Sequence, residues 1–393
     1  MNCVNAIPSH KIDVNSQTKQ IRAKLQTNRQ TANKGRKPIY LFLAAILIVA
    51  SAFVAYSILY NSEDPSSSSQ IATSTNTHPS APESTSITVI DGLENTVTIT
   101  LPVTRIVSIN YGLTEIICAI GGQDLLVGRD ELSTSPPSVT SVPTVASTSN
   151  DPNMELLLES KPDLILVDSM FRSKTHEIAL IKDAGIPLYI ESTGNFSRIL
   201  ECINNMGRIL NKEQTANDLR NFLTHYQTLV ADRVANLSPS QQPRVYLEWT
   251  SSWYTATHPS VASVLTAAGG INIAEGGLAS SMGDISPEFV MEANPEVILK
   301  VVSGTNYGVE SLKVQYDDLL GRSLLSDTDA IKNQRVYTYY NIITQGIRYP
   351  IGLLYYEKWL YPDLLSDIDP AAVQDELYQR FFGITLEGVY TYP

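Results

Sequence analysis

Two hydrophobic spacings alternate along the chain after residue 86. Apolar runs rich in β-forming residues lie at 87–90, 97–101, 105–109, 164–167 and 186–190. Between these runs, one segment with helical spacing begins near Thr114, a second begins near Asn153, and a third ends near Ala184. The turn residues Asp91 and Gly92 between the first two runs predict a β-hairpin. The later alternation of strands and helices predicts an α/β fold with mainly parallel, Rossmann-like sheets covered by helices.

The middle of the chain has a different pattern. Within residues 193–238 apolar positions recur every three or four residues, which is the helical period, and no strand pattern interrupts them. A break near Asn211 divides this stretch, and the second helix is expected from about 213 to 236, before Pro239 and Pro243. A second series of strands begins at Arg244, so the segment 193–238 is interpreted as helices that link two lobes.

An internal duplication supports this division into two lobes. Residues Asp151, Glu155, Glu159, Pro162 and Ile165 recur 133 positions later as Asp284, Glu288, Glu292, Pro295 and Ile298. Segments 119–128 and 181–189 also have counterparts, at 267–276 and 331–339, in the same order. We therefore expect an N-terminal lobe at 87–192, a C-terminal lobe at 239–350 with a cleft between them, and a helical extension at 351–393.

Charge divides the chain before the lobes begin. The whole sequence has a net charge of −12, which argues against a nucleic-acid partner, yet residues 1–37 hold eight basic residues and one acidic residue. Residues 38–62 contain no charged side chain, and their apolar part, at about 1.5 Å per residue, is long enough to cross a bilayer. These features predict a cytoplasmic basic leader (1–37), a transmembrane anchor (38–60) and a Ser/Thr/Pro-rich stalk (61–86).

This arrangement makes the protein a single-pass protein of the cell membrane, with its N-terminus in the cytoplasm and its head outside the cell. The alternative is a cleaved signal peptide, for which Ala50-Ser51-Ala52 would be the cleavage site.

Several short motifs carry a family resemblance. The segments 105–115, 161–165, 184–187, 267–272 and 294–298 resemble the helical-backbone class, or class III, of solute-binding proteins, which serve ABC importers for iron–siderophore complexes, haem and cobalamin. The resemblance implies an extracellular head, expected to be a monomer, that captures a metal chelate and delivers it to ABC permease subunits. An iron–siderophore complex is the first choice of ligand, and cobalamin, another corrinoid or haem are alternatives. The anchor and stalk resemble those of archaeal members.

No catalytic motif in the sequence supports an enzymatic function. The sequence contains no G-x-S-x-G, Walker or H-E-x-x-H motif, and its five histidines have no metal-ligand spacing. We therefore expect neither an enzyme nor a resident cofactor or metal ion. A tethered ligand-sensing or adhesion module remains as an alternative function.

The sharpest candidates for function are Glu155 and Glu288, because both lobes repeat them. Asn153 and Ser286 precede them as helix caps, so each glutamate falls in a first helical turn. An acidic residue there also stabilises the helix dipole by about 0.3–1 kcal/mol, which is the purely structural alternative. The resemblance implies that each glutamate docks onto arginines of one permease subunit.

Ligand-binding residues are expected in the loops that follow the strands. Aromatic rings offer flat apolar area to a macrocycle, and arginine neutralises an anionic metal complex. The candidates are Tyr111, Arg129, Phe171, Arg172, Trp249, Trp253, Tyr254, Tyr307, Tyr340 and Arg348.

Overall fold

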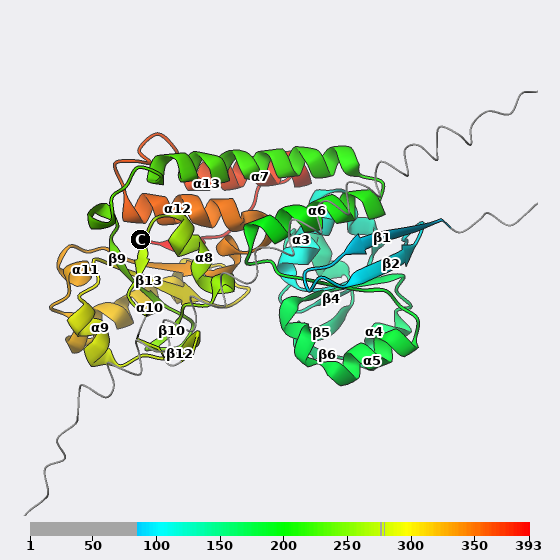
Figure 1. Ribbon diagram of the computed structural model, residues 1–393, viewed down its shortest axis with the longest axis horizontal. Helices are drawn as coiled ribbons and strands as arrows, with labels where there is room; N and C mark the ends of the chain where they lie inside the picture. The colour runs from blue at the N-terminus through cyan, green and yellow to red at the C-terminus, as the bar shows by residue number, and fades with distance from the viewer. Residues whose placement is uncertain (1–84, 276, 279) are drawn as a thin grey trace, which may run out of the picture. The chain divides into compact units, whose positions relative to one another are not determined.

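The computed structural model describes residues 85–275, 277–278 and 280–393, which Figure 1 shows as a coloured ribbon. The predicted leader, the predicted anchor and nearly all of the predicted stalk lie outside the described residues. Within the described ranges, no helix has the length and apolar character needed to span a membrane.

The N-terminal lobe begins with an antiparallel hairpin of β1 (Ser86–Ile90) and β2 (Thr96–Thr100). Its main sheet has the strand order β6-β5-β4-β3-β7-β8. The strands are β3 (Ile106–Ile109), β4 (Leu126–Asp130), β5 (Thr144–Thr148), β6 (Asp151–Pro152), β7 (Leu164–Asp168) and β8 (Leu188–Glu191). The helices are α3 (Tyr111–Ala119), α4 (Met154–Glu159) and α5 (Thr175–Asp183). Helix α3 begins before the expected Thr114 because the Asn110 side chain caps it, accepting a hydrogen bond from Leu113 N at 3.1 Å.

Two helices without an intervening strand, α6 (Phe196–Ile209) and α7 (Glu213–Val234), lead to the second lobe. The sheet of this lobe has the order β12-β10-β9-β13-β14-β15, and β11 also pairs with β9. The strands are β9 (Arg244–Glu248), β10 (Tyr254–Ala256), β11 (Ile271–Asn272), β12 (Met282–Asp284), β13 (Val297–Val302), β14 (Val336–Tyr340) and β15 (Thr391–Tyr392). The helices are α8 (Pro259–Ala267), α9 (Pro287–Ala293), α10 (Val309–Gly321) and α11 (Asp329–Lys332).

The two sheets share one parallel topology. In the first lobe, β3 lies between β4 and β7, and β7 pairs with β8. In the second lobe, β9 lies between β11 and β13, and β13 pairs with β14. The orders β4-β3-β7-β8 and β11-β9-β13-β14 are therefore equivalent, which confirms the predicted fold class of two similar α/β lobes.

Alternate residues of the central strands face different cores. In β7, Leu164 and Leu166 contact one large cluster, whereas Ile165 and Val167 contact a second cluster confined to the first lobe. Strand β13 has the same alternation: Val297 and Leu299 join the large cluster, and its neighbour Ile298 joins a third cluster within the second lobe. One face of each sheet therefore packs in a core that belongs to its own lobe alone, and the other face packs in the core that both lobes share.

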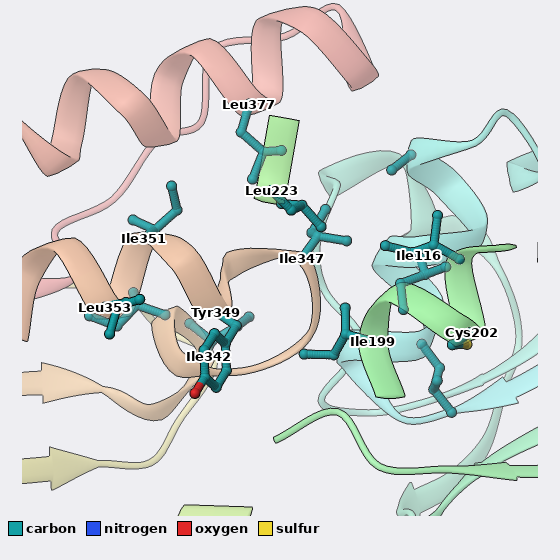
Figure 2. Close-up of a cluster of buried hydrophobic side chains, with 14 of the residues drawn as sticks. Ile116, Ile199, Cys202, Leu223, Ile342, Ile347, Tyr349, Ile351, Leu353 and Leu377 are labelled. Atoms are coloured by element: carbon teal, nitrogen blue, oxygen red, sulfur yellow. The ribbon is translucent and has the colours of Figure 1, made fainter. Parts of the chain in front are cut away.

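The shared core includes the linking helices and the end of the chain. Figure 2 shows Ile116 of α3, Ile199 of α6 and Leu223 of α7 near Ile347 and Tyr349, which follow β14. Helix α12 (Tyr349–Leu360) is buried along most of its length, and α13 (Pro370–Phe382) packs beside it. The sequence predicted a helical extension at 351–393. Helix α12 begins two residues earlier, and strand β15 after α13 extends the second sheet.

Candidate functional site

The candidate ligand site lies where the parallel strands of both lobes end. Tyr111 follows β3, and the loop containing Leu132 and Thr134 follows β4. In the second lobe, the loop containing Tyr307 follows β13, and Asn341 follows β14. Ligands of open α/β sheets bind at the carboxyl ends of the strands, and here these ends from both lobes line the same cavities.

Two adjoining cavities share Tyr307. The smaller, about 80 Å³, is lined by Tyr111 and Leu132 of the first lobe and by Val302, Ser303, Gly304, Tyr307, Asn341 and Ile342. The larger, about 410 Å³, is lined by Thr134, Ser135, Pro137, Ser138, Thr305, Tyr307, Ile384, Thr385, Leu386, Glu387 and Tyr390. Its volume lies within the roughly 300–1,000 Å³ of small-ligand pockets, and its walls come from both lobes and the C-terminal tail.

A third cavity of about 560 Å³ shares no residue with these two. It is lined by the start of α6, by α8 and by Tyr349, and its other lining residues include Thr257 and Glu275. None of the three cavities has a Lys, Arg or His among its lining residues within the described chain. The site therefore presents aromatic rings and hydroxyl groups and has no cationic wall.

Tyrosines connect the walls of the site. The Tyr111 hydroxyl accepts a hydrogen bond from Asn341 Nδ2 at 2.9 Å, which joins the two lobes. The Tyr307 ring packs against Tyr340 and Tyr390, with centroids 5.2 and 4.9 Å apart. Burial raises the pKa of Tyr307 to about 12 and raises the pKa of Tyr111 as well, so both hydroxyls remain protonated at neutral pH.

Of the ten predicted ligand residues, Tyr111 and Tyr307 line the cavities and are brought together there. Tyr340 is buried beside them, and its hydroxyl donates to Asn306 O at 2.8 Å, which holds the loop after β13. None of the other eight residues lines any of the three cavities.

Two of the predicted arginines have partners inside the protein. Arg348 is fully buried, donates to Glu115 Oε1 at 2.6 Å and lies over the rings of Tyr378 and Tyr390. Burial opposes the charge of Arg348, but the neighbouring Glu115 carboxylate outweighs it and raises the pKa of the guanidinium. Arg129 is buried as well, and its guanidinium donates to backbone carbonyls of the loop that follows β4.

The remaining candidates lie elsewhere. Phe171 is buried in the core that belongs to the first lobe alone, and the adjacent Arg172 is exposed. Trp253 donates its backbone N–H to the buried Glu248, and Arg322 stacks on its ring at 4.9 Å. The carbonyl of Trp249 accepts from Lys300 Nζ at 2.9 Å, and Tyr254 belongs to the β10–β12 pair.

Sequence reasoning missed most of the cavity wall. It did not select the hydroxyl residues Thr134, Ser135 and Thr305, nor Asn341 and Tyr390. The first four also follow strands, so the rule that selected Tyr111 applied to them, but small hydroxyl residues are common in loops. Tyr390 had no comparable signal, because its place depends on the return of the chain after α13.

The repeated glutamates occupy equivalent exposed positions. Glu155 and Glu288 lie in the first turns of α4 and α9, which are capped by Asn153 and Ser286. The Ser286 hydroxyl donates to Glu288 at 2.7 Å and lowers the pKa of that carboxyl. Each helix also exposes a large apolar side chain, Leu156 in α4 and Met291 in α9, which have exposed fractions of 43% and 39%. Both lobes thus present the same combination of a first-turn carboxylate and an exposed apolar side chain.

A model of the family described as "Periplasmic binding protein" matches residues 106–342, which is more than half of the chain. The chain belongs to this family. A vitamin B12-binding protein of Yersinia pestis is 31% identical over 216 residues, which cover 53% of this chain and 72% of that protein. An uncharacterised ABC transporter substrate-binding lipoprotein of Bacillus subtilis, YvrC, is 26% identical over 291 residues, covering 72% of this chain and 87% of that protein.

The solved structures agree on the fold. A TroA-like periplasmic binding protein, FepB, from Veillonella parvula superposes with a TM-score of 0.65 at 23% identity and covers 78% of this chain and 99% of that one. The predicted resemblance to class III solute-binding proteins is thus confirmed, and the chain is a binding protein rather than an enzyme. Within the described residues, no group of three or more His, Cys, Asp or Glu side chains is arranged to hold a metal ion.

Proposed function

We propose that the chain is the substrate-binding component of an ABC importer, and that it captures a corrinoid between its lobes outside the cell. The observation that carries the proposal is the cavity of about 410 Å³ whose walls come from both lobes and which would receive part of the corrinoid. Family membership supports the transport role, because relatives of this chain are substrate-binding proteins of ABC transporters or vitamin B12-binding proteins.

The chemistry of the cavity walls favours a corrinoid over the iron–siderophore complex that the sequence put first. A corrinoid carries peripheral amides around an apolar ring, and these groups match hydroxyls and tyrosine rings such as Thr134, Thr305 and Tyr307. An anionic ferric chelate would need cationic partners to offset its desolvation. Of the three arginines expected to supply them, Arg129 and Arg348 are instead bound to protein groups, and the exposed Arg172 lines none of the three cavities.

Binding is tested by titrating the full-length chain with cyanocobalamin, hemin and ferric enterobactin in a calorimeter. We expect saturable, one-to-one binding of cyanocobalamin and much weaker binding of the anionic iron complex. Tight binding of ferric enterobactin without binding of cyanocobalamin would contradict the corrinoid proposal and leave the importer proposal standing. Binding of none of the three would contradict both.

Delivery of the ligand requires docking onto the permease. We propose that Glu155 and Glu288 each pair with arginines of one permease subunit, because two equivalent lobes present the same carboxylate to a two-fold partner. The exposed Leu156 and Met291 on the same helices would add apolar contact.

A pair of charge reversals tests docking separately from ligand capture. The double variant Glu155→Arg with Glu288→Arg should abolish uptake of radiolabelled cyanocobalamin in cells and leave ligand affinity unchanged. The matched control is Glu177→Arg with Glu310→Arg, since these glutamates also lie in first helical turns, one in each lobe, but on α5 and α10. Equal uptake by both double variants would show that the repeated glutamates do not dock.

A further inference from the structure

The last ten residues of the chain contribute a wall of the ligand cavity. After α13 ends at the left-handed Gly383, the chain passes Ile384, Thr385, Leu386 and Glu387, all of which line the cavity of about 410 Å³. These residues lie outside the segment 106–342 that matches the family model. The cavity therefore has one wall that the family match does not include.

Hydrogen bonds hold this tail to the second lobe. Val389 N donates to Tyr307 O at 2.8 Å, and Tyr340 N donates to Tyr390 O at 3.0 Å, before β15 pairs antiparallel with β14. Tyr390 is only 5% exposed and packs on the Tyr307 ring, which is itself a cavity residue. At Gly388 the tail passes so close to Tyr307 that an added Cβ would lie 3.1 Å from the Tyr307 Cβ. The tail is thus a fixed wall, packed like the rest of the lobe.

The helix before the tail is held to the first lobe. Tyr378 of α13 is buried, and its hydroxyl donates to Glu115 Oε1 of α3 at 2.5 Å. The same hydroxyl lies 3.0 Å from Ser135 Oγ, and Ser135 lines the cavity. Because α13 is bound to one lobe and β15 to the other, residues 384–387 must cross between the lobes at the cavity.

One side chain of the tail differs chemically from the rest of the wall. Glu387 carries the only carboxylate among the residues that line this cavity, and none of them carries a positive charge. Its side chain is exposed, and no hydrogen bond or ion pair to the carboxylate is present among the described residues. An unpaired carboxylate at a binding cavity accepts N–H donors from a ligand and repels ligand carboxylates.

We propose that the C-terminal tail selects the ligand, and that Glu387 discriminates between ligands by their charge. The proposal rests on the proposed function. It assigns to Glu387 the preference for uncharged or cationic chelates that bear amides over anionic chelates. The amide N–H groups of a corrinoid donate to the Glu387 carboxylate, whereas the propionates of a haem or the catecholates of a ferric siderophore are repelled.

The test compares cyanocobalamin, which bears amides, with hemin, which bears two carboxylates. Both are titrated against the full-length wild type, Glu387→Gln, Glu387→Lys and the control Asp375→Asn. Asp375 is an exposed acid of the same extension that does not line the cavity, so the control removes an equal charge without changing the wall. The Glu387 side chain is exposed, so its replacement should leave the thermal unfolding midpoint unchanged.

Loss of a charge-assisted hydrogen bond should weaken cyanocobalamin binding by about tenfold in Glu387→Gln. In Glu387→Lys, the affinity ratio of hemin to cyanocobalamin should rise further, and Asp375→Asn should match the wild type. A wild type that binds cyanocobalamin, with the same affinity ratio in all three variants, would overturn the role of Glu387 and leave the proposed function intact. A wild type that binds neither probe would overturn the proposed capture of a corrinoid and, with it, this inference.

Discussion

The buried ion pair of Glu115 and Arg348 joins the two lobes, and the removal of either charge should lower stability strongly. Glu115 belongs to α3 of the first lobe, whereas Arg348 lies in the turn between β14 and α12. Both side chains have an exposed fraction of 0%, and their contact is 2.6 Å. In Arg348→Met, the Tyr378 hydroxyl would be the only hydrogen-bond partner left to Glu115 among the residues that the structure describes. An uncompensated buried carboxylate costs about 3–5 kcal/mol of unfolding free energy, so the single variant should lose that much.

Replacing both charges should cost much less than the sum of the two single replacements. Among the described residues, Glu115 Oε2 and Arg348 Nε and Nη1 have no hydrogen-bond partner, so part of the pair's desolvation is uncompensated. Apolar side chains of similar size remove that penalty together with the attraction. For Arg348→Met with Glu115→Met, we expect a coupling of about 2 kcal/mol or more between the two sites.

Urea unfolding of the full-length chain, followed by tryptophan fluorescence, measures all four corners of this double-mutant cycle. The slope of free energy against urea should be equal in all four proteins, because the exposed area on unfolding is unchanged. If the two single losses add to the double loss within about 0.5 kcal/mol, the charges do not interact and the reasoning is refuted.

Three further predictions use the same measurement. Burial raises the pKa of Glu357 to about 7, so the wild type should lose stability as the pH rises from about 4.5 to 7. The variant Glu357→Gln should therefore be more stable than the wild type by roughly 2–3 kcal/mol at pH 8, and the two proteins should differ little at pH 4. Gly346→Ala should destabilise more than Gly185→Ala by about 1–3 kcal/mol: both residues have positive φ, but only at Gly346 would a Cβ lie 2.8 Å from the backbone of α3. Lys300→Met should cost less than Glu248→Met, because Glu248 keeps a second cationic partner, whereas the loss of Glu248 leaves two cations without their carboxylate.

The fold was predictable because its signals are local and repeated. The duplicated Asp151 and Asp284 both lie in short edge strands, β6 and β12, that lead into α4 and α9. Their helix caps, first-turn glutamates and following apolar strands need no information from distant residues. The apolar run at 164–167 also identified β7 as a strand, although it did not reveal that opposite faces of the strand belong to different cores.

The site was less predictable because residue type does not reveal a partner far away in sequence. An arginine in the turn-like segment 346–350 looked suited to an anionic ligand, yet Glu115, which is 233 residues away, neutralises it. Arg129 of β4 likewise donates to carbonyls of the segment between β4 and β5. Conversely, nothing local to Glu387 indicates that the chain returns to the cavity, because that position follows from the packing of α13 and the pairing of β15.

These contacts together bear on how a ligand is recognised. The lobes are joined by a shared apolar core, by the buried pair of Glu115 and Arg348, and by an extension that is bound to helix α3 of the first lobe and to the sheet of the second. Closure of the lobes around a ligand would have to break such contacts. Binding to a preformed cavity avoids that cost and therefore gives a more favourable binding free energy. Selectivity must then come from the chemistry of those walls, including the tail. A permease that docks on α4 and α9 would therefore recognise the loaded protein through the ligand itself or through small shifts of these helices.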